Sequence, residues 1–240
     1  MTCIIGAKCA DGCVIIADTR VLREFRSSNE SKISLLWDKV IVAGEGNTAV
    51  LDNFTEELSR VALPETPNFG KVAKTVEDVV QGLQARYRPR IAEEFEFRAL
   101  VMGLQSFDAG DPNVRLVYSE GISEEVKDFV IIGHGAPNAV PLFRLLYDNM
   151  LTVNELAVLG FFTIAFVSFL GLDETVGFDK LGPEAVILKA NEEPSFLNTL
   201  NPEFSTARQS LSSLAFRYKL VKSIWATIPQ AFENLDQSLF

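Results

Sequence analysis

The opening of the chain constrains the fold more than any other stretch. Two apolar runs, residues 3–10 and 13–17, flank the pair Asp11-Gly12. An Asp-Gly pair between apolar runs is a strong signal of a tight β-hairpin, because the turn needs residues that tolerate positive φ. The sequence therefore predicts that the chain begins with two antiparallel strands joined at Asp11-Gly12.

Further strands are predicted in blocks that are separated by pairs of helices. These strands cover residues 32–37, 40–43, 97–104, 114–118, 128–132 and 185–188. The helices cover residues 47–61, 71–88 and 137–150, a very apolar segment after Thr152, and a terminal segment over 211–228. Residues 21–31 are interpreted as a polar connector, Gly44 as the end of a strand, and Pro89 as the end of the second helix.

The order of these elements favours an α+β fold. Strands in blocks are typical of antiparallel sheets, whereas a parallel sheet alternates single strands with helices. Two packed sheets between helix pairs would bury the fourth helix, which carries no charge over residues 156–172. We therefore predict a four-layer αββα sandwich over residues 1–190. Residues 191–240 are expected to add a loop and an extra helix that pack on this domain or on a partner.

The composition excludes several classes of function. The chain is 48% hydrophobic and 22% charged, as in ordinary globular domains, and its net charge of −10 leaves no basic stripe for nucleic acid. The three cysteines lie within the first thirteen residues and have no histidine at zinc-ligand spacing. We expect no metal and no cofactor, and a cytoplasmic location. The N-terminus has no signal-peptide pattern, and acidic residues bracket residues 156–172, which favours a buried helix over a membrane span.

The second residue, Thr2, can carry chemistry. Initiator methionine is removed efficiently before small residues, so we expect Thr2 to become the N-terminus. An N-terminal threonine unites a nucleophile and a base, because its hydroxyl can attack an acyl carbon while its own α-amine takes the proton. An unperturbed α-amine titrates at about 7.7–8.0, which suits a base at neutral pH.

Several short motifs accompany Thr2. They are Asp11-Gly12, the Ala-Asp-Thr-Arg run at residues 17–20, Lys32-Ile33, Ala43-Gly44, Gly133-x-Gly135, and Asp173 four residues before Gly177. Together with Thr2 they resemble the landmarks of proteasome β-type N-terminal nucleophile hydrolases. Each motif is weak alone, but the combination and its spacing are specific. The resemblance covers residues 2–188.

The resemblance implies a catalytic role for five positions. Thr2 would be the nucleophile, and the cation of Lys32 would lower the pKa of the Thr2 amine. Asp18 would pair with Lys32 and fix it. The backbone N–H of Gly44 would donate to the oxyanion, a contact worth roughly 3–4 kcal/mol in acyl transfer. Asp173 would support the terminal amine.

Four further positions are candidates for support. They are Thr19, Arg20, His134 and Thr175. The resemblance implies that Arg20 braces the carboxylate network of the site. His134 and Val176 stand where the family usually has serines that help the amine exchange protons. Thr175 and His134 are the candidates to replace those hydroxyl groups, since histidine titrates near neutral pH.

Three functions remain open at this point. The first is a threonine peptidase that hydrolyses its acyl-enzyme. The second is a peptide ligase similar to the connectases, in which another amine takes the acyl group. The third is a non-catalytic assembly subunit with a retained methionine. All three imply a homo-oligomer, the first two also a peptide or protein substrate, and none implies a nucleic acid or a membrane as partner.

Overall fold

A computed structural model of the chain describes residues 2–23, 26–62, 68–91, 97–106, 109–178, 182–197, 201–203 and 205–206. Within these ranges the chain forms two five-stranded antiparallel sheets, a two-stranded ribbon and helices α1–α4. The predicted terminal helix over residues 211–228 lies outside the described residues. The division of the chain at residue 190 stays a prediction.

The first sheet contains the opening hairpin. Its strand order is β10-β1-β2-β11-β12, with β1 (Ile4–Lys8), β2 (Gly12–Ala17), β10 (Phe129–Ile132), β11 (Glu184–Lys189) and β12 (Ser195–Leu197). Strands β1 and β2 pair antiparallel with Lys8 opposite Cys13, so the predicted hairpin is confirmed. Asp11 Oδ1 also accepts a hydrogen bond from the Val153 N–H at 2.7 Å, which ties the turn to the fourth helix. Strand β12 was not predicted; it is only three residues long, too short for a period-two pattern.

The second sheet has the order β5-β6-β7-β8-β9. Its strands are β5 (Ile33–Leu36), β6 (Val40–Gly46), β7 (Phe97–Ser106), β8 (Ala109–Tyr118) and β9 (Ser123–Glu125). The prediction that Gly44 ends its strand is wrong, because pairing with β7 continues to Gly46 opposite Phe97. Strand β8 likewise begins before Pro112. This proline lies outside the segment of β8 that pairs with β9, so the backbone N–H that proline lacks costs the sheet little pairing energy.

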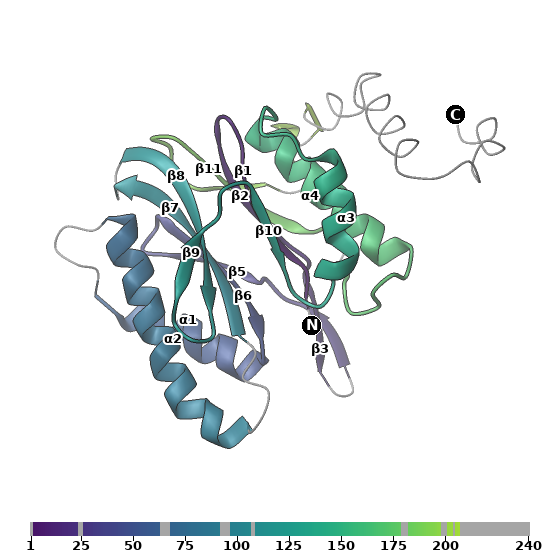
Figure 1. Cartoon of the computed structure of the whole chain (residues 1–240). Coiled ribbons are helices and arrows are strands. Elements are labelled where there is room, and N and C mark those ends of the chain that lie inside the picture. The colour runs from purple at the N-terminus through teal and green to yellow at the C-terminus, as the bar shows by residue number, and fades with distance from the viewer. Residues whose placement is uncertain are drawn as a thin grey trace, which may run out of the picture.

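The predicted connector over residues 21–31 is a strand pair instead. Strands β3 (Arg20–Arg23) and β4 (Arg26–Asn29) pair antiparallel and project from the molecule beside its N-terminus (Figure 1). The stretch is polar and lacks an alternating apolar face, so hydrophobic periodicity gives no strand signal there. Four residue pairs, from Arg20 opposite Asn29 to Arg23 opposite Arg26, form the backbone pairing of this ribbon.

Local sequence signals set the boundaries of the helices. The helices are α1 (Thr48–Arg60), α2 (Phe69–Ile91), α3 (Ala136–Leu146) and α4 (Val153–Phe169). Asn47 caps α1, and Thr152 with Glu155 forms a capping box at the start of α4. Helix α2 continues through Pro89 to Ile91, so its predicted end is wrong; only one backbone donor is lost this close to the C-terminus.

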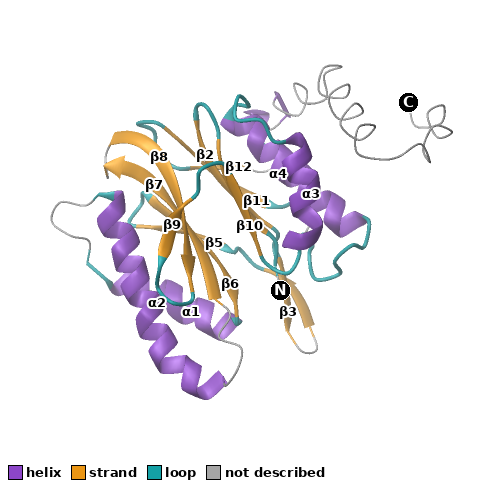
Figure 2. Ribbon diagram, viewed as in Figure 1, coloured by secondary structure: helices purple, strands orange, loops and turns teal. Residues whose placement is uncertain are grey.

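The layers stack as helices, sheet, sheet, helices (Figure 2). Helices α1 and α2 cover the β5–β9 sheet, α3 and α4 cover the other sheet, and one apolar core lies between the sheets. The predicted four-layer αββα sandwich is therefore confirmed. Helix α4 buries apolar side chains around most of its circumference, as its composition requires. Among the described residues, no helix has the length and apolar character needed to cross a membrane.

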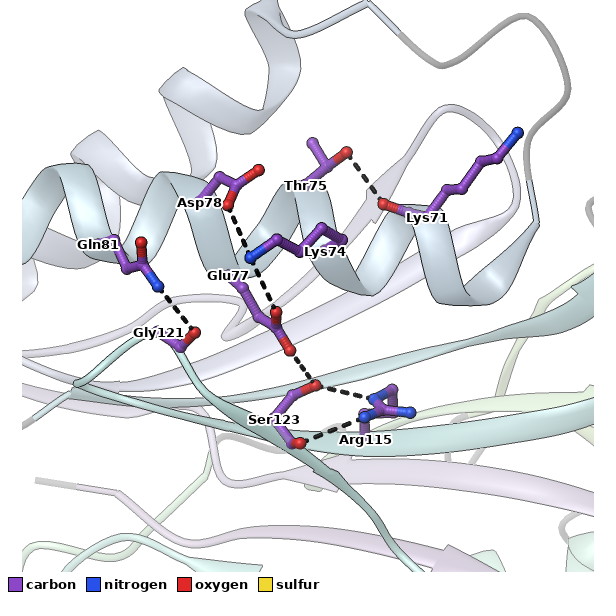
Figure 3. A network of polar contacts seen from close by, with 9 residues as sticks. All are labelled: Lys71, Lys74, Thr75, Glu77, Asp78, Gln81, Arg115, Gly121 and Ser123. Carbon is purple, nitrogen blue, oxygen red and sulfur yellow. Dashed lines mark hydrogen bonds and ion pairs between the residues drawn. The ribbon is translucent and has the colours of Figure 1, made fainter.

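A polar network fastens α2 to the outer edge of its sheet (Figure 3). Ser123 Oγ donates to Glu77 Oε1 at 2.5 Å and accepts from Arg115 Nε at 2.9 Å. Gln81 Nε2 donates to the carbonyl oxygen of Gly121 at 3.3 Å. These bonds join the α2 surface to the β8–β9 turn, at the opposite edge of the sheet from β5 and β6.

Candidate active site

Asp18 is the centre of a buried polar group at the open end of the first hairpin. Its Oδ1 accepts hydrogen bonds from Thr2 Oγ1 at 2.8 Å, from the Cys3 N–H at 2.7 Å and from Lys32 Nζ at 2.8 Å. Its Oδ2 accepts from the Gly177 N–H at 3.3 Å. Asp18 is fully buried, so this carboxylate depends on these donors for its charge.

The hairpin register explains this convergence. Thr2 precedes β1 and Asp18 follows β2, and antiparallel pairing places these two ends side by side. The Asp18 N–H donates to the carbonyl oxygen of Cys3 at 3.1 Å, which extends the ladder by one bond. Lys32 precedes β5 in the facing sheet and reaches Asp18 from there.

Lys32 is buried beside its counter-ion. Burial lowers the pKa of Lys32, and the charge and hydrogen bond of Asp18 oppose this effect without cancelling it. The ammonium therefore loses a proton more readily than an ordinary lysine. A cation of this kind next to a nucleophile is suited to disfavour protonation of a neighbouring amine.

Three predicted residues line one cleft of about 740 Å³: Thr2, Lys32 and Gly44. Gly44 lies in β6 and contacts α1, because a Cβ at this position would come within 2.6 Å of Leu51 Cδ2. The cleft thus runs between the first hairpin, the start of β5, the end of β6 and α1.

Asp173 forms a second polar group. Its Oδ2 lies 2.8 Å from His134 Nδ1, and its Oδ1 accepts from the Thr175 N–H at 2.8 Å and from Thr175 Oγ1 at 2.5 Å. Burial alone would raise the pKa of Asp173, but the hydrogen bonds from Thr175 and His134 outweigh it and hold the pKa below its ordinary value. Val176 is buried and packs beside Gly135.

Two glycines connect this second group to Thr2. The Gly135 N–H donates to the carbonyl oxygen of Thr2 at 3.1 Å. Gly133 has a φ of +103°, and a Cβ there would lie 2.1 Å from the same oxygen. The loop that carries His134 therefore lies directly against the Thr2 backbone.

Thr19 and Arg20 form hydrogen bonds to the loop over residues 174–177. Their N–H groups both donate to the carbonyl oxygen of Gly177, at 3.0 and 2.9 Å, and Arg20 Nη1 donates to the carbonyl oxygen of Glu174 at 2.8 Å. Arg20 thus braces the backbone between Asp173 and Gly177 and reaches Asp18 only through it. Thr19 Oγ1 is buried and makes no hydrogen bond within the described part of the chain.

Gly177 is the residue that sequence reasoning missed as a contact. Its sequence signal is its spacing from Asp173, yet its N–H donates to Asp18 and its carbonyl oxygen accepts from the N–H groups of Thr19 and Arg20. There is also little room for a side chain at position 177, since a Cβ there would lie 2.7 Å from Arg20 Nε. Across the ranges that the structure describes, no group of three or more metal-ligating side chains could hold an ion.

The comparisons with known proteins identify the family. Residues 1–165 match the protein family described as Proteasome subunit. The chain belongs to the proteasome subunit family. A curated relative of this proteasome-family chain, Proteasome subunit alpha of Methanococcus maripaludis, is 26% identical over 165 residues, which are 64% of this chain and 60% of that relative. The matched segment thus spans three-fifths of the length of that relative.

Solved structures share the fold of this proteasome-family chain. Anbu (ancestral beta-subunit) from Yersinia bercovieri has a TM-score of 0.70 at 16% identity and covers 95% of this chain and 98% of its own. Anbu from Hyphomicrobium sp. strain MC1 has a TM-score of 0.66 at 19% identity, with 94% and 97% covered. A helical assembly of the Anbu complex from Pseudomonas aeruginosa has a TM-score of 0.68 at 15% identity, with 96% and 99% covered.

Replacing Gly133 with alanine is expected to lower the free energy of unfolding by about 3 kcal/mol or more, because the new Cβ would meet the Thr2 carbonyl and the backbone would keep its positive φ. Gly171→Ala is a matched control, since Gly171 has a φ of +62° but open space around it. It should cost only about 1–2 kcal/mol. Urea unfolding of both variants measures the difference, and equal costs would contradict the close contact.

The low pKa of Asp173 predicts a pH-dependent stability. Its folded pKa lies below the ordinary value, so its contribution is complete above the unfolded pKa and is lost as the pH falls through the folded pKa. Asp173→Asn should therefore cost about 1–3 kcal/mol at pH 6, and this difference should shrink as the pH falls below about 4. Urea unfolding between pH 6 and 3 tests this, with the exposed Asp78→Asn as control. A difference that is constant with pH would refute it.

Proposed function

We propose that the chain is an N-terminal threonine amidohydrolase that cleaves peptide bonds through an acyl-enzyme on Thr2. The observation that carries this proposal is the convergence of Thr2 Oγ1 and Lys32 Nζ on one buried oxygen of Asp18. Membership of the proteasome subunit family supports it. The reaction needs Met1 to be removed, since only then do the hydroxyl and the α-amine belong to one residue.

The reaction then follows from the chemistry of Thr2. As Oγ1 bonds to the acyl carbon, its proton passes to the α-amine, which is the base. The tetrahedral oxyanion forms, and it collapses as the amide bond breaks and the leaving amine takes the proton. Water attacks the resulting ester and releases the acid, and the hydroxyl of Thr2 is restored.

The surrounding groups have distinct roles in this proposal. Lys32 holds a positive charge near the α-amine and so favours its neutral, basic form, while Asp18 fixes Lys32 and orients the Thr2 hydroxyl. Gly44 lines the same cleft, and its N–H would donate to the oxyanion. His134, fixed by Asp173 through Nδ1, is a candidate to exchange protons with the amine in place of the family serine.

Intact-mass measurement of the full chain tests the proposal. We expect a mass without Met1, and a single adduct on Thr2 after incubation with a peptide epoxyketone, a reagent that needs both the hydroxyl and the α-amine. Peptide mapping should locate the adduct on Thr2. A chain that lacks Met1 and forms no adduct, or forms it elsewhere, would refute the proposal.

A ligase is the second candidate, and the side chain of Val176 favours it. Val176 is apolar and buried where the family has a serine, so proton exchange after acylation would differ from that of a hydrolase. In that case the Thr2 ester would persist and pass to an added amine. Product analysis with and without an amine acceptor separates ligation from hydrolysis.

Assembly is a further part of the proposal. A related fold is described as a helical assembly of the Anbu complex, and the curated relative is a proteasome subunit, so we propose that copies of this chain associate with one another. The three cysteines are unpaired, which fits the reducing cytoplasm. Retained Met1 in such an assembly would instead favour a non-catalytic subunit.

A further inference from the structure

The cleft beside Thr2 has an unusual distribution of charge. Its lining residues include four carboxylates and one amine: Glu30, Glu45, Asp52 and Glu56, and Lys32. Asp18 contacts the amine of Lys32 at 2.8 Å, so the positive charge is balanced within the site. Carboxylates therefore outnumber amines among the charged residues that line the cleft.

We propose that this cleft selects peptides with a lysine or arginine side chain next to the carbonyl that Thr2 attacks. The inference rests on the proposed function, because it assigns a substrate class to the Thr2 site. It does not depend on the acidic residues alone, since the same 740 Å³ cleft contains Thr2 and the Gly44 backbone.

The cleft offers an apolar surface for the stem of such a side chain. Leu51 lines it and is half-buried, whereas Val42 and Phe54 also line it but are almost fully buried and leave little surface to contact. Leu51 also packs against the backbone of Gly44, so this apolar surface begins at the proposed oxyanion donor. Lysine and arginine bury their methylene stems along apolar surface and keep the charged head in a polar environment.

Two carboxylates of the cleft lie on α1, the helix that also carries Leu51. Asp52 and Glu56 are one helical turn apart on α1, so they share the face that lines the cleft. Asp52 has no ion-pair partner among the residues that the structure describes, whereas Glu56 pairs with Arg60 and Glu45 pairs with Arg98. Asp52 is therefore the carboxylate whose charge is least compensated, and we assign it the largest share of the selectivity.

Labelling rates of the full chain test this inference. Three peptide epoxyketones that differ only in the side chain next to the warhead (arginine, leucine or glutamate) are compared by intact mass. We expect arginine to react faster than leucine and glutamate to react slowest. Asp52→Asn should reduce the arginine-to-leucine rate ratio about fivefold, and Asp52→Asn with Glu56→Gln about tenfold. The ratio should also fall at 1 M salt.

A surface carboxylate on α2 provides the control variant for this test. Asp78→Asn makes the same chemical change on the exposed face of α2 and should leave the ratio unchanged. Equal rates for the three side chains, or a ratio that Asp52→Asn does not alter, would overturn the inference while Thr2 reactivity stands. If no reagent labels Thr2, the proposed function fails. In that case the affinities of the three matching peptide amides, measured by calorimetry, decide the inference, and equal affinities would overturn it.

Discussion

Thr2→Ala is expected to abolish peptide cleavage and adduct formation, with a loss on the order of 10⁴-fold or more in kcat, because the proposed ester forms on the Thr2 hydroxyl. The fold should survive. Thr2 contributes one hydrogen bond to Asp18, and Asp18 keeps its bonds from the Cys3 N–H, Lys32 and the Gly177 N–H. The expected loss of stability is therefore only about 1 kcal/mol. Peptide turnover and thermal unfolding measure the two effects separately.

Thr2→Ser is the matched control for this substitution. Serine keeps the hydroxyl and the α-amine, so labelling on residue 2 should persist at a measurable rate. If Thr2→Ala retains more than a tenth of the wild-type turnover, the nucleophile lies elsewhere. If both variants are inactive while the fold is intact, the methyl group of threonine also matters for positioning.

Lys32→Met is expected to lower both stability and activity. Methionine is unbranched like lysine and only one atom shorter, but the substitution leaves Asp18 fully buried without its cation, and breaking a buried pair in this way costs about 3–5 kcal/mol. Activity should fall by about 10²–10⁴-fold, because the Thr2 amine would lose the neighbouring charge that keeps it unprotonated and able to accept a proton. Urea unfolding and epoxyketone labelling measure the two effects, and Lys74→Met on the exposed face of α2 is the control.

A double variant separates the two roles of Lys32. Lys32→Met with Asp18→Asn removes both charges, so part of the lost stability should return. Activity should not return, because neither the cation nor the carboxylate is present. Recovery of activity in the double variant would show that the pair acts only in folding.

The fold could be predicted largely because its elements have strong local signals. The Asp11-Gly12 turn and the Thr152–Glu155 capping box each fix a boundary within a few residues. The β3–β4 ribbon, β9 and β12 lack such signals, since they are short or polar, although each of these strands pairs with the strand next to it in the chain. The end of α2 was misplaced because a proline in the last turn breaks a single bond.

The candidate site likewise contains contacts that the sequence predicts and contacts that it does not. The group around Asp18 was predictable because a hairpin brings its two ends together, which makes spacing along the chain a guide to proximity. The contact between His134 and Asp173 joins residues 39 positions apart across two loops, and no periodic pattern encodes it. The cleft carboxylates were not predicted as a group either, because they become neighbours only when α1 packs beside the end of β6.

The position of Asp18 also links folding to binding. One carboxylate receives donors from the start of β1, from the start of β5 and from the loop at Gly177, so it joins segments of both sheets. Any molecule that binds the cleft only when these segments are together must stabilise the whole sandwich by mass action. The amide protons of Cys3 and Gly177 would then exchange more slowly in the complex. Ligands for this protein could accordingly be found through thermal stability and hydrogen exchange, without an assay for chemistry.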